Sequence, residues 1–128
     1  MPRAESDARI LVVDDERAIR DWAASALARR GYSVVAVASA SEALRILSAG
    51  AGDINLVLTD IKMPEIDGIE LARRVRALHP NTKVIYMTGF SPEIVDPGST
   101  VLYKPFTFKL LIDEVARVLA GRTKATMG

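Results

Sequence analysis

Short runs of aliphatic and β-branched residues alternate along the chain with longer stretches in which apolar positions recur at helical spacing. The short runs are residues 10–13 (ILVV), 32–37 (YSVVAV), 54–59 (INLVLT), 83–88 (KVIYMT) and 100–103 (TVLY). Runs that are apolar at successive positions are typical of strands buried on both faces, as in a parallel sheet. The pattern therefore predicts a strand in each of these places.

Helical periodicity follows four of these strands. The first predicted helix presents one apolar stripe and ends at Gly31. The next three begin at the capping residues Ser39, Asp67 and Thr107. Their expected ends are Gly50, the His79–Pro80 pair and Gly121.

The interval 89–99 (GFSPEIVDPGS) breaks this alternation. It contains two prolines and two glycines, which disfavour a helix, so we expect a loop with at most one helical turn at Pro92–Asp96. Elsewhere strands and helices alternate. This order predicts an α/β domain in which helices cover both faces of a parallel sheet and the connections are right-handed.

Length and composition exclude only a few classes of protein. The 128 residues fit one domain, and we expect residues 1–8 and 122–128 to be flexible ends of a domain at 9–121. A net charge of +1 gives no sign of a nucleic-acid or membrane surface, and no apolar run approaches the roughly 20 residues of a membrane span. Cysteine is absent, which excludes disulfides and is compatible with the cytoplasm.

Polar residues stand where the predicted strands end. Asp14 and Asp15 close the first strand, Asp60 the third, Thr88 the fourth and Lys104 the fifth. Because the carboxyl ends of parallel strands meet at one edge of a sheet, we expect these side chains to converge. Two unit charges about 4 Å apart repel by about 4 kcal/mol at an effective dielectric constant of about 20. The carboxylates therefore predict a bound cation or a protonated member.

Magnesium suits this set best, since it takes oxygen ligands and needs few protein groups. Zinc is disfavoured because cysteine is absent and the one histidine, His79, lies far from these positions. Mg²⁺ held by carboxylates usually bridges to phosphate, so Asp60 can act as a nucleophile that attacks phosphorus and forms an acyl phosphate.

The other polar groups fit the same chemistry. Thr88 would donate a hydrogen bond from its hydroxyl, and Lys104 would bring a positive charge to the phosphoryl oxygens. The backbone N–H groups of Ile61 and Gly89 would complete the cradle around these oxygens.

Four short motifs, taken in order, resemble the receiver domain of two-component response regulators. They are VVDDE (12–16), LTDIKMPEIDG (58–68), MTG (87–89) and KPF (104–106), each at the end of a predicted strand. The resemblance covers about residues 8–121. It implies a flavodoxin-like, doubly wound sheet of five parallel strands in the order 2-1-3-4-5.

The resemblance also implies a role for each site residue. It makes Asp60 the phosphoacceptor, Thr88 the switch hydroxyl and Lys104 the lysine that pairs with the phosphoryl group. The implied ligands of Mg²⁺ are Asp14 (mostly through water), Asp15, Asp60 and the carbonyl oxygen of Lys62. The Lys104–Pro105 bond would be cis, and Gly68 matches the glycine of the loop after the acceptor.

Two features depart from the family pattern. Members usually carry a full helix between the threonine and the lysine, where only fifteen residues stand here, so we expect a fourth helix that is short or replaced by a loop. Many members also have an aromatic residue three places before the lysine, where this chain has Val101; Phe90 is a possible substitute. The Thr-Gly-Phe sequence at 88–90 is similar to receivers with a reduced fourth helix in alphaproteobacterial single-domain regulators and hybrid kinases.

The resemblance predicts a phosphoacceptor in a phosphorelay. A histidine kinase or a histidine phosphotransfer protein would donate the phosphoryl group to Asp60 in a Mg²⁺-dependent step, and a protein-interaction surface would switch. Output would pass to a downstream protein or an attached domain, without direct contact to nucleic acid or membrane. The domain would assist its own phosphorylation and dephosphorylation, which leaves the label of enzyme open.

Two alternatives remain at the level of sequence. One is a Mg²⁺-dependent phosphohydrolase with Asp60 as nucleophile, although such enzymes typically place a second acid where this chain has Lys62. The other is a receiver-like interaction module that is not phosphorylated. The joint presence of all five strand-end residues argues against the latter.

Overall fold

A computed structural model describes residues 8–50, 53–89, 95 and 98–121. The elements along the chain are β1 (Arg9–Val13), α1 (Arg17–Arg29), β2 (Ser33–Val37), α2 (Ala40–Ser48), β3 (Leu56–Asp60), α3 (Gly68–Leu78), β4 (Lys83–Thr88), β5 (Thr100–Tyr103) and α4 (Phe108–Leu119). The described strands form one sheet of five strands, all neighbours parallel, in the order β2-β1-β3-β4-β5. This confirms the predicted fold class and strand order.

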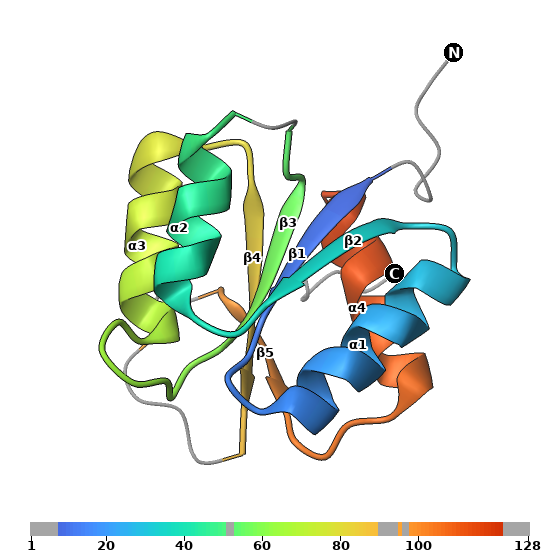
Figure 1. The fold of residues 1–128 in the computed structure, drawn as a ribbon. Helices are drawn as coiled ribbons and strands as arrows, with labels where there is room; N and C mark the ends of the chain where they lie inside the picture. Colours follow the sequence, from blue (N-terminus) through green and yellow to red (C-terminus); the bar gives the residue numbers. More distant parts are fainter. Residues whose placement is uncertain (1–7, 51–52, 90–94, 96–97, 122–128) are drawn as a thin grey trace.

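The helices lie in two layers, with α2 and α3 on one face of the sheet and α1 and α4 on the other (Figure 1). Successive residues of β1 point into opposite layers. Ile10 and Val12 pack with α1 and α4, whereas Leu11 and Val13 pack with α2 and α3, and all four are fully buried. The continuous apolar run therefore reflects burial on both faces of the central strands.

The three predicted capping residues are confirmed. The side chains of Ser39, Asp67 and Thr107 accept hydrogen bonds from the backbone N–H groups three residues later, at 3.2, 2.9 and 3.0 Å. These bonds satisfy N–H groups that the first turn of a helix otherwise leaves unpaired. Helices α2, α3 and α4 therefore begin directly after the predicted capping residues.

The start of the packed domain differs by one residue from the predicted boundary. Ala8 was expected in the flexible start, but it is 3% exposed and its carbonyl accepts a hydrogen bond from the Ser33 N–H, so it belongs to the packed domain. Residues 1–7 and 122–128, the rest of the two ends that we expect to be flexible, lie outside the described residues. The same holds for the expected turn at Pro92–Asp96, apart from Val95.

Within the described ranges, no helix is both long and apolar enough to cross a membrane.

Candidate functional site

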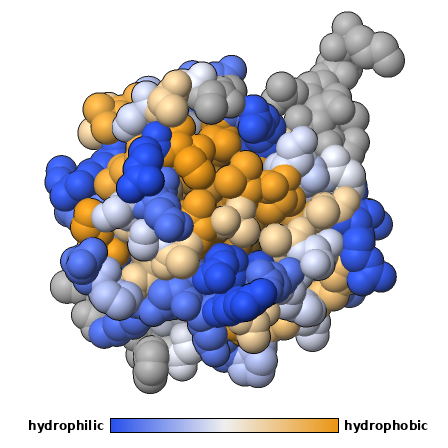
Figure 2. Space-filling view, viewed as in Figure 1, coloured by the Kyte–Doolittle hydropathy of each residue, from blue (hydrophilic) through white to orange (hydrophobic). Residues whose placement is uncertain are grey.

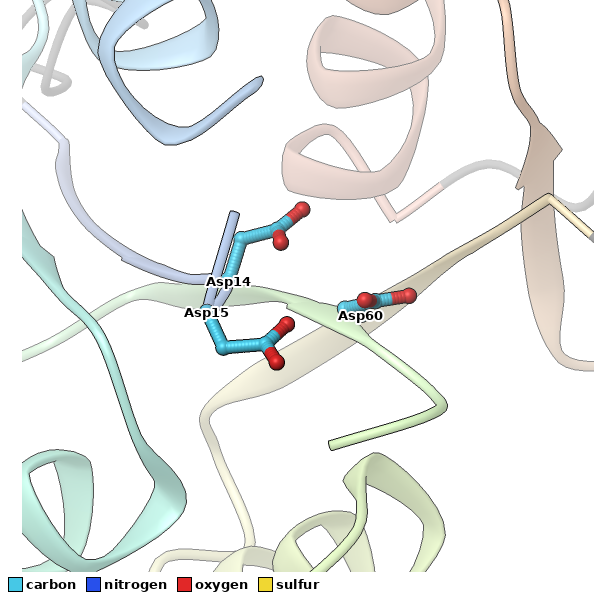
Figure 3. A group of neighbouring side chains, drawn as sticks. All are labelled: Asp14, Asp15 and Asp60. Carbon is cyan, nitrogen blue, oxygen red and sulfur yellow. The ribbon is translucent and has the colours of Figure 1, made fainter. Parts of the chain in front are cut away.

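The ends of β1 and β3 bring three carboxylates together. Val13 stands opposite Thr59 in the sheet, so the residues that follow them, Asp14 and Asp60, emerge at the same edge. Asp14, Asp15 and Asp60 each supply one carboxylate oxygen to a group whose members lie within 4.8 Å of one another (Figure 3). Asp14 is fully buried, Asp60 is 8% exposed and Asp15 faces solvent. The predicted convergence of the acids is confirmed.

Lys104 joins this group from the end of β5. Its Nζ atom lies 3.0 Å from Asp14 Oδ2, 3.5 Å from Asp60 Oδ2 and 4.0 Å from Glu16 Oε1. Burial alone would lower the pKa of Lys104, but the hydrogen bond to Asp14 and the charges of the three acids outweigh it and raise the pKa above its usual value. Lys104 is therefore a charged ammonium that partly neutralises the carboxylates.

The surroundings of the Asp60 carboxyl group disfavour its charged form. Burial raises the pKa of Asp60 from 3.8 to about 6; the Lys104 ammonium opposes this rise, and the Asp14 and Asp15 carboxylates add to it. A carboxylate that is poorly solvated and near like charges gains from any cation placed beside it. The three oxygens form an all-oxygen donor set, which fits Mg²⁺ better than a softer metal.

The backbone of Asp60 is fixed by its neighbours. The Thr59 hydroxyl donates to the Asp60 carbonyl oxygen at 2.9 Å. Gly68, at the start of α3, packs so closely that a Cβ atom there would lie 2.1 Å from the same oxygen. The Gly68 N–H also donates to the Ile61 carbonyl at 2.9 Å. Gly68 is therefore needed for the close approach of two backbone segments.

The other residues predicted for the site, Thr88, Gly89, Lys62 and Ile61, lie at or next to the ends of β3 and β4. Thr88 ends β4, is 1% exposed, and its carbonyl accepts a hydrogen bond from the Lys104 N–H at 2.8 Å. Gly89 and Lys62 are exposed next to strand ends. The Ile61 N–H donates to the Met87 carbonyl at 3.0 Å and so continues the ladder between β3 and β4. That bond counts against the predicted role of Ile61 in a phosphoryl cradle.

The structure also bears on the two departures from the family pattern. Val101 is partly buried against a small cluster that includes Tyr86 and Ile61. Tyr103 stands opposite Thr88 in the sheet and is 53% exposed. Phe90, the possible substitute for the missing aromatic, lies outside the described residues. The Lys104–Pro105 peptide bond is cis, as the resemblance implied.

Two contacts at this edge were not predicted from the sequence. Arg20 donates from its guanidinium to the Asp14 carbonyl oxygen at 2.9 Å. Trp22 of α1 packs against Phe106, two residues after Lys104, with ring centroids 5.6 Å apart. In the sequence, Arg20 and Trp22 are recognisable only as part of the helix that follows the acidic pair. Their position on this helix does not show that Arg20 contacts Asp14 or that Trp22 contacts Phe106.

The fold, the acidic cluster and the bridging lysine together are typical of one class of protein, and comparison with known proteins identifies the same class. The chain belongs to the response regulator receiver domain family, whose model matches residues 10–116. It is therefore a phosphoacceptor receiver domain of two-component phosphorelay signalling, and neither the phosphohydrolase nor the non-phosphorylated module is favoured.

The relatives include proteins of about the same length as this chain and much longer ones. The chain is 37% identical to the response regulator receiver protein CpdR of Brucella abortus over 87% of this chain and 96% of CpdR. It is also 37% identical to the sensor kinase CckA of the same organism, over 88% of this chain but only 12% of CckA. A structure of TrrA from Thermotoga maritima in complex with Mg²⁺-BeF aligns with a TM-score of 0.78 and 33% identity, covering 88% of this chain and 99% of TrrA.

Proposed function

We propose that Asp60 is the residue that accepts the phosphoryl group and that residues 9–121 form the receiver unit. The observation that carries this is the bridge from Lys104 Nζ to Asp14 and Asp60, at 3.0 and 3.5 Å, beside the three converging carboxylates. A buried carboxylate flanked by a cation and by a set of oxygen ligands that suits Mg²⁺ is fitted to nucleophilic attack on phosphorus. Receiver domains interact with histidine kinases and phosphotransfer proteins, and a phosphohistidine of such a partner is the proposed donor.

The proposed metal ligands are Asp14, Asp15, Asp60 and the carbonyl oxygen of Lys62. Bound Mg²⁺ would neutralise charge on the carboxylates and on the phosphoryl oxygens. The Mg²⁺-BeF complex of TrrA, a relative of the same fold, supports this choice of metal. The buried position of Asp14 makes it suited to anchor the site, whereas exposed Asp15 can meet an ion that arrives from solvent.

In the proposed transfer, an Asp60 carboxylate oxygen forms a bond to phosphorus while the bond from phosphorus to the imidazole nitrogen breaks. The electron pair of the broken bond goes to that nitrogen, and the imidazole leaves on the opposite side. Lys104 then exchanges a carboxylate partner for a phosphoryl oxygen, and the Thr88 hydroxyl and Gly89 N–H donate to the others. These residues are positioned in advance, which lowers the cost of orienting the reactants.

Phosphorylation then changes which surface the domain presents. The new group brings a charge of about −1.5 to −2 and three acceptor oxygens to the ends of β3, β4 and β5. Moving an equilibrium from 1:99 to 99:1 needs about 5.5 kcal/mol of differential stabilisation, to which two or three charge-assisted hydrogen bonds contribute. We propose that the affected surface is the one after β4 and β5, read by a downstream protein or attached domain in the cytoplasm.

The test is a titration with beryllofluoride, which mimics an aspartyl phosphoryl group, monitored by two-dimensional NMR. In the presence of Mg²⁺, the native chain should show shifts at the ends of β3, β4 and β5, and Asp60→Asn should show none of them. Asp113→Asn is a matched control, since it makes the same chemical change on the exposed side of α4. Equal responses of the native chain and Asp60→Asn, or a native response that does not depend on Mg²⁺, would contradict the proposal.

A further inference from the structure

Asp14 is held by hydrogen bonds at four of its atoms. Its N–H donates to the Val37 carbonyl at 3.2 Å, and Oδ1 accepts from the Glu16 N–H at 2.9 Å. Its Oδ2 accepts from Lys104 Nζ and its carbonyl oxygen from the Arg20 guanidinium, at 3.0 and 2.9 Å. Three of these bonds fix the residue itself, whereas the bond from Arg20 fixes the peptide group that leads to the next residue.

That peptide group helps to orient Asp15. The Asp14 carbonyl belongs to the rigid plane that joins Asp14 to Asp15, so a hydrogen bond to this oxygen restrains ψ of Asp14 and φ of Asp15, the two dihedral angles that set the Cα–Cβ direction of Asp15. Asp15 is exposed, so the backbone of the turn rather than side-chain packing places its carboxylate. Arg20 itself is placed by α1, in which its N–H donates to the Glu16 carbonyl at 3.0 Å.

We propose that Arg20 is a positioning residue for Mg²⁺ binding, acting through the Asp14–Asp15 peptide group. The inference rests on the proposed function, because it requires the three carboxylates to hold the ion. Arg20 has no proposed contact with the ion or the phosphoryl group. Its guanidinium keeps the Asp15 carboxylate within 4.8 Å of the oxygens of Asp14 and Asp60, so the ligand set is assembled before the ion arrives.

Removing Arg20 would have two effects on the affinity for Mg²⁺ that act in opposite directions, one through its charge and one through the orientation of Asp15. A positive charge near a divalent cation opposes its binding, so loss of charge alone would tighten the affinity for Mg²⁺. Loss of a residue that orients a ligand typically weakens metal affinity by 10–100-fold. We expect Arg20→Ala to raise the Kd for Mg²⁺ by about tenfold. Arg20→Lys keeps the charge and one donor and should recover part of this loss.

Arg17→Ala is the matched control. Arg17 lies on the same helix and its replacement removes the same charge, but its side chain is 84% exposed and pairs with Asp21 on the surface. We expect its Kd for Mg²⁺ to stay within about twofold of the native value, because surface pairs contribute little. The contrast between the two alanine variants separates position from net charge.

The experiment is a Mg²⁺ titration of each folded variant by two-dimensional NMR, followed through the amide signals of Asp15 and Ile61. In metal-free samples, the Asp15 amide of Arg20→Ala should already differ from the native signal. Phosphorylation by acetyl phosphate should approach the native rate at saturating Mg²⁺, with only the half-saturating concentration raised. A native chain that does not bind Mg²⁺ would refute the proposed function, whereas native-like affinity in Arg20→Ala would refute this inference alone. If Arg20→Ala does not fold, Arg20→Gln, which is too short to make the contact, is judged by the same criterion.

Discussion

Replacing Asp60 with asparagine should stabilise the domain near neutral pH in the absence of Mg²⁺, although it removes the proposed phosphoacceptor. In the native chain, burial is the largest cause of the rise in the pKa of Asp60 to about 6, with Asp14 and Asp15 adding to it against the opposing effect of Lys104. Ionisation of Asp60 is therefore easier in the unfolded chain than in the folded one. Asparagine has nearly the same shape and no charge to desolvate, so it avoids this cost.

The magnitude follows from the two pKa values. As pH rises from 3.8 to about 6, the unfolded chain has released the Asp60 proton while the folded chain still holds it, so the stability of the native domain falls. At 1.36 kcal/mol per pH unit this amounts to about 3 kcal/mol, complete above pH 6. The contribution of the protonated group is fully present below pH 3.8 and is lost as pH passes through the folded pKa. In Asp60→Asn this loss does not occur, which corresponds to a melting temperature higher by about 10 °C at pH 7.5.

The assay is urea unfolding of both proteins in EDTA at several pH values between 4.5 and 7.5. The difference in free energy of unfolding should be about 1 kcal/mol at pH 4.5 and should grow to about 3 kcal/mol at pH 7.5, since the other titrating groups are common to both proteins. Adding Mg²⁺ at ten times its Kd should stabilise the native chain by about 1.4 kcal/mol and the variant by less. A difference that does not change with pH, or a native chain that is the more stable at pH 7.5 in EDTA, would refute the reasoning.

Two further substitutions test the geometry. Gly68→Ala places a Cβ atom 2.1 Å from the Asp60 carbonyl oxygen, so we expect a loss of about 2–4 kcal/mol in unfolding free energy and slower phosphorylation; Gly89→Ala, whose added Cβ meets nothing within 4 Å, should change stability by less than about 0.5 kcal/mol in the same urea assay. Lys104→Met removes the cation from a buried bridge, so we expect a loss of about 3 kcal/mol at pH 7.5 in EDTA and a further rise in the pKa of Asp60, measured by NMR; an unchanged pKa would show that Lys104 does not act on Asp60.

The fold could be predicted from the sequence because the helix-capping residues and the hydrophobic pattern indicate the same helices and strands. The run at 10–13 is apolar at every position and the run at 54–59 at four of six positions, which is typical of strands buried on both faces. Ser39, Asp67 and Thr107 marked helix starts through a bond that spans only three residues, so tertiary structure did not have to be known. Parallel strand order then placed the acids at one edge.

Features that depend on register or on contacts between distant elements were beyond the sequence. Whether the Ile61 N–H is free or belongs to the ladder is decided by how far the pairing of β3 with β4 extends, and the pairing continues one residue past Asp60. The bond from Arg20 to the Asp14 carbonyl likewise requires the angle at which α1 leaves β1. Neither quantity has a signature in residue type or spacing.

Lys104 neutralises the two buried acids of the site to different degrees. Asp14 is fully buried and satisfied by Lys104 and the Glu16 N–H, whereas Asp60 shares the same ammonium at the longer distance of 3.5 Å. The lysine therefore pairs more closely with Asp14, and at Asp60 it opposes but does not cancel the rise in pKa that burial causes. In the proposed function, a phosphoryl group on Asp60 would bring more negative charge than either carboxylate and would draw Lys104 away from Asp14, which would then depend on a bound cation. We therefore expect metal binding and phosphorylation to be coupled through one ammonium group.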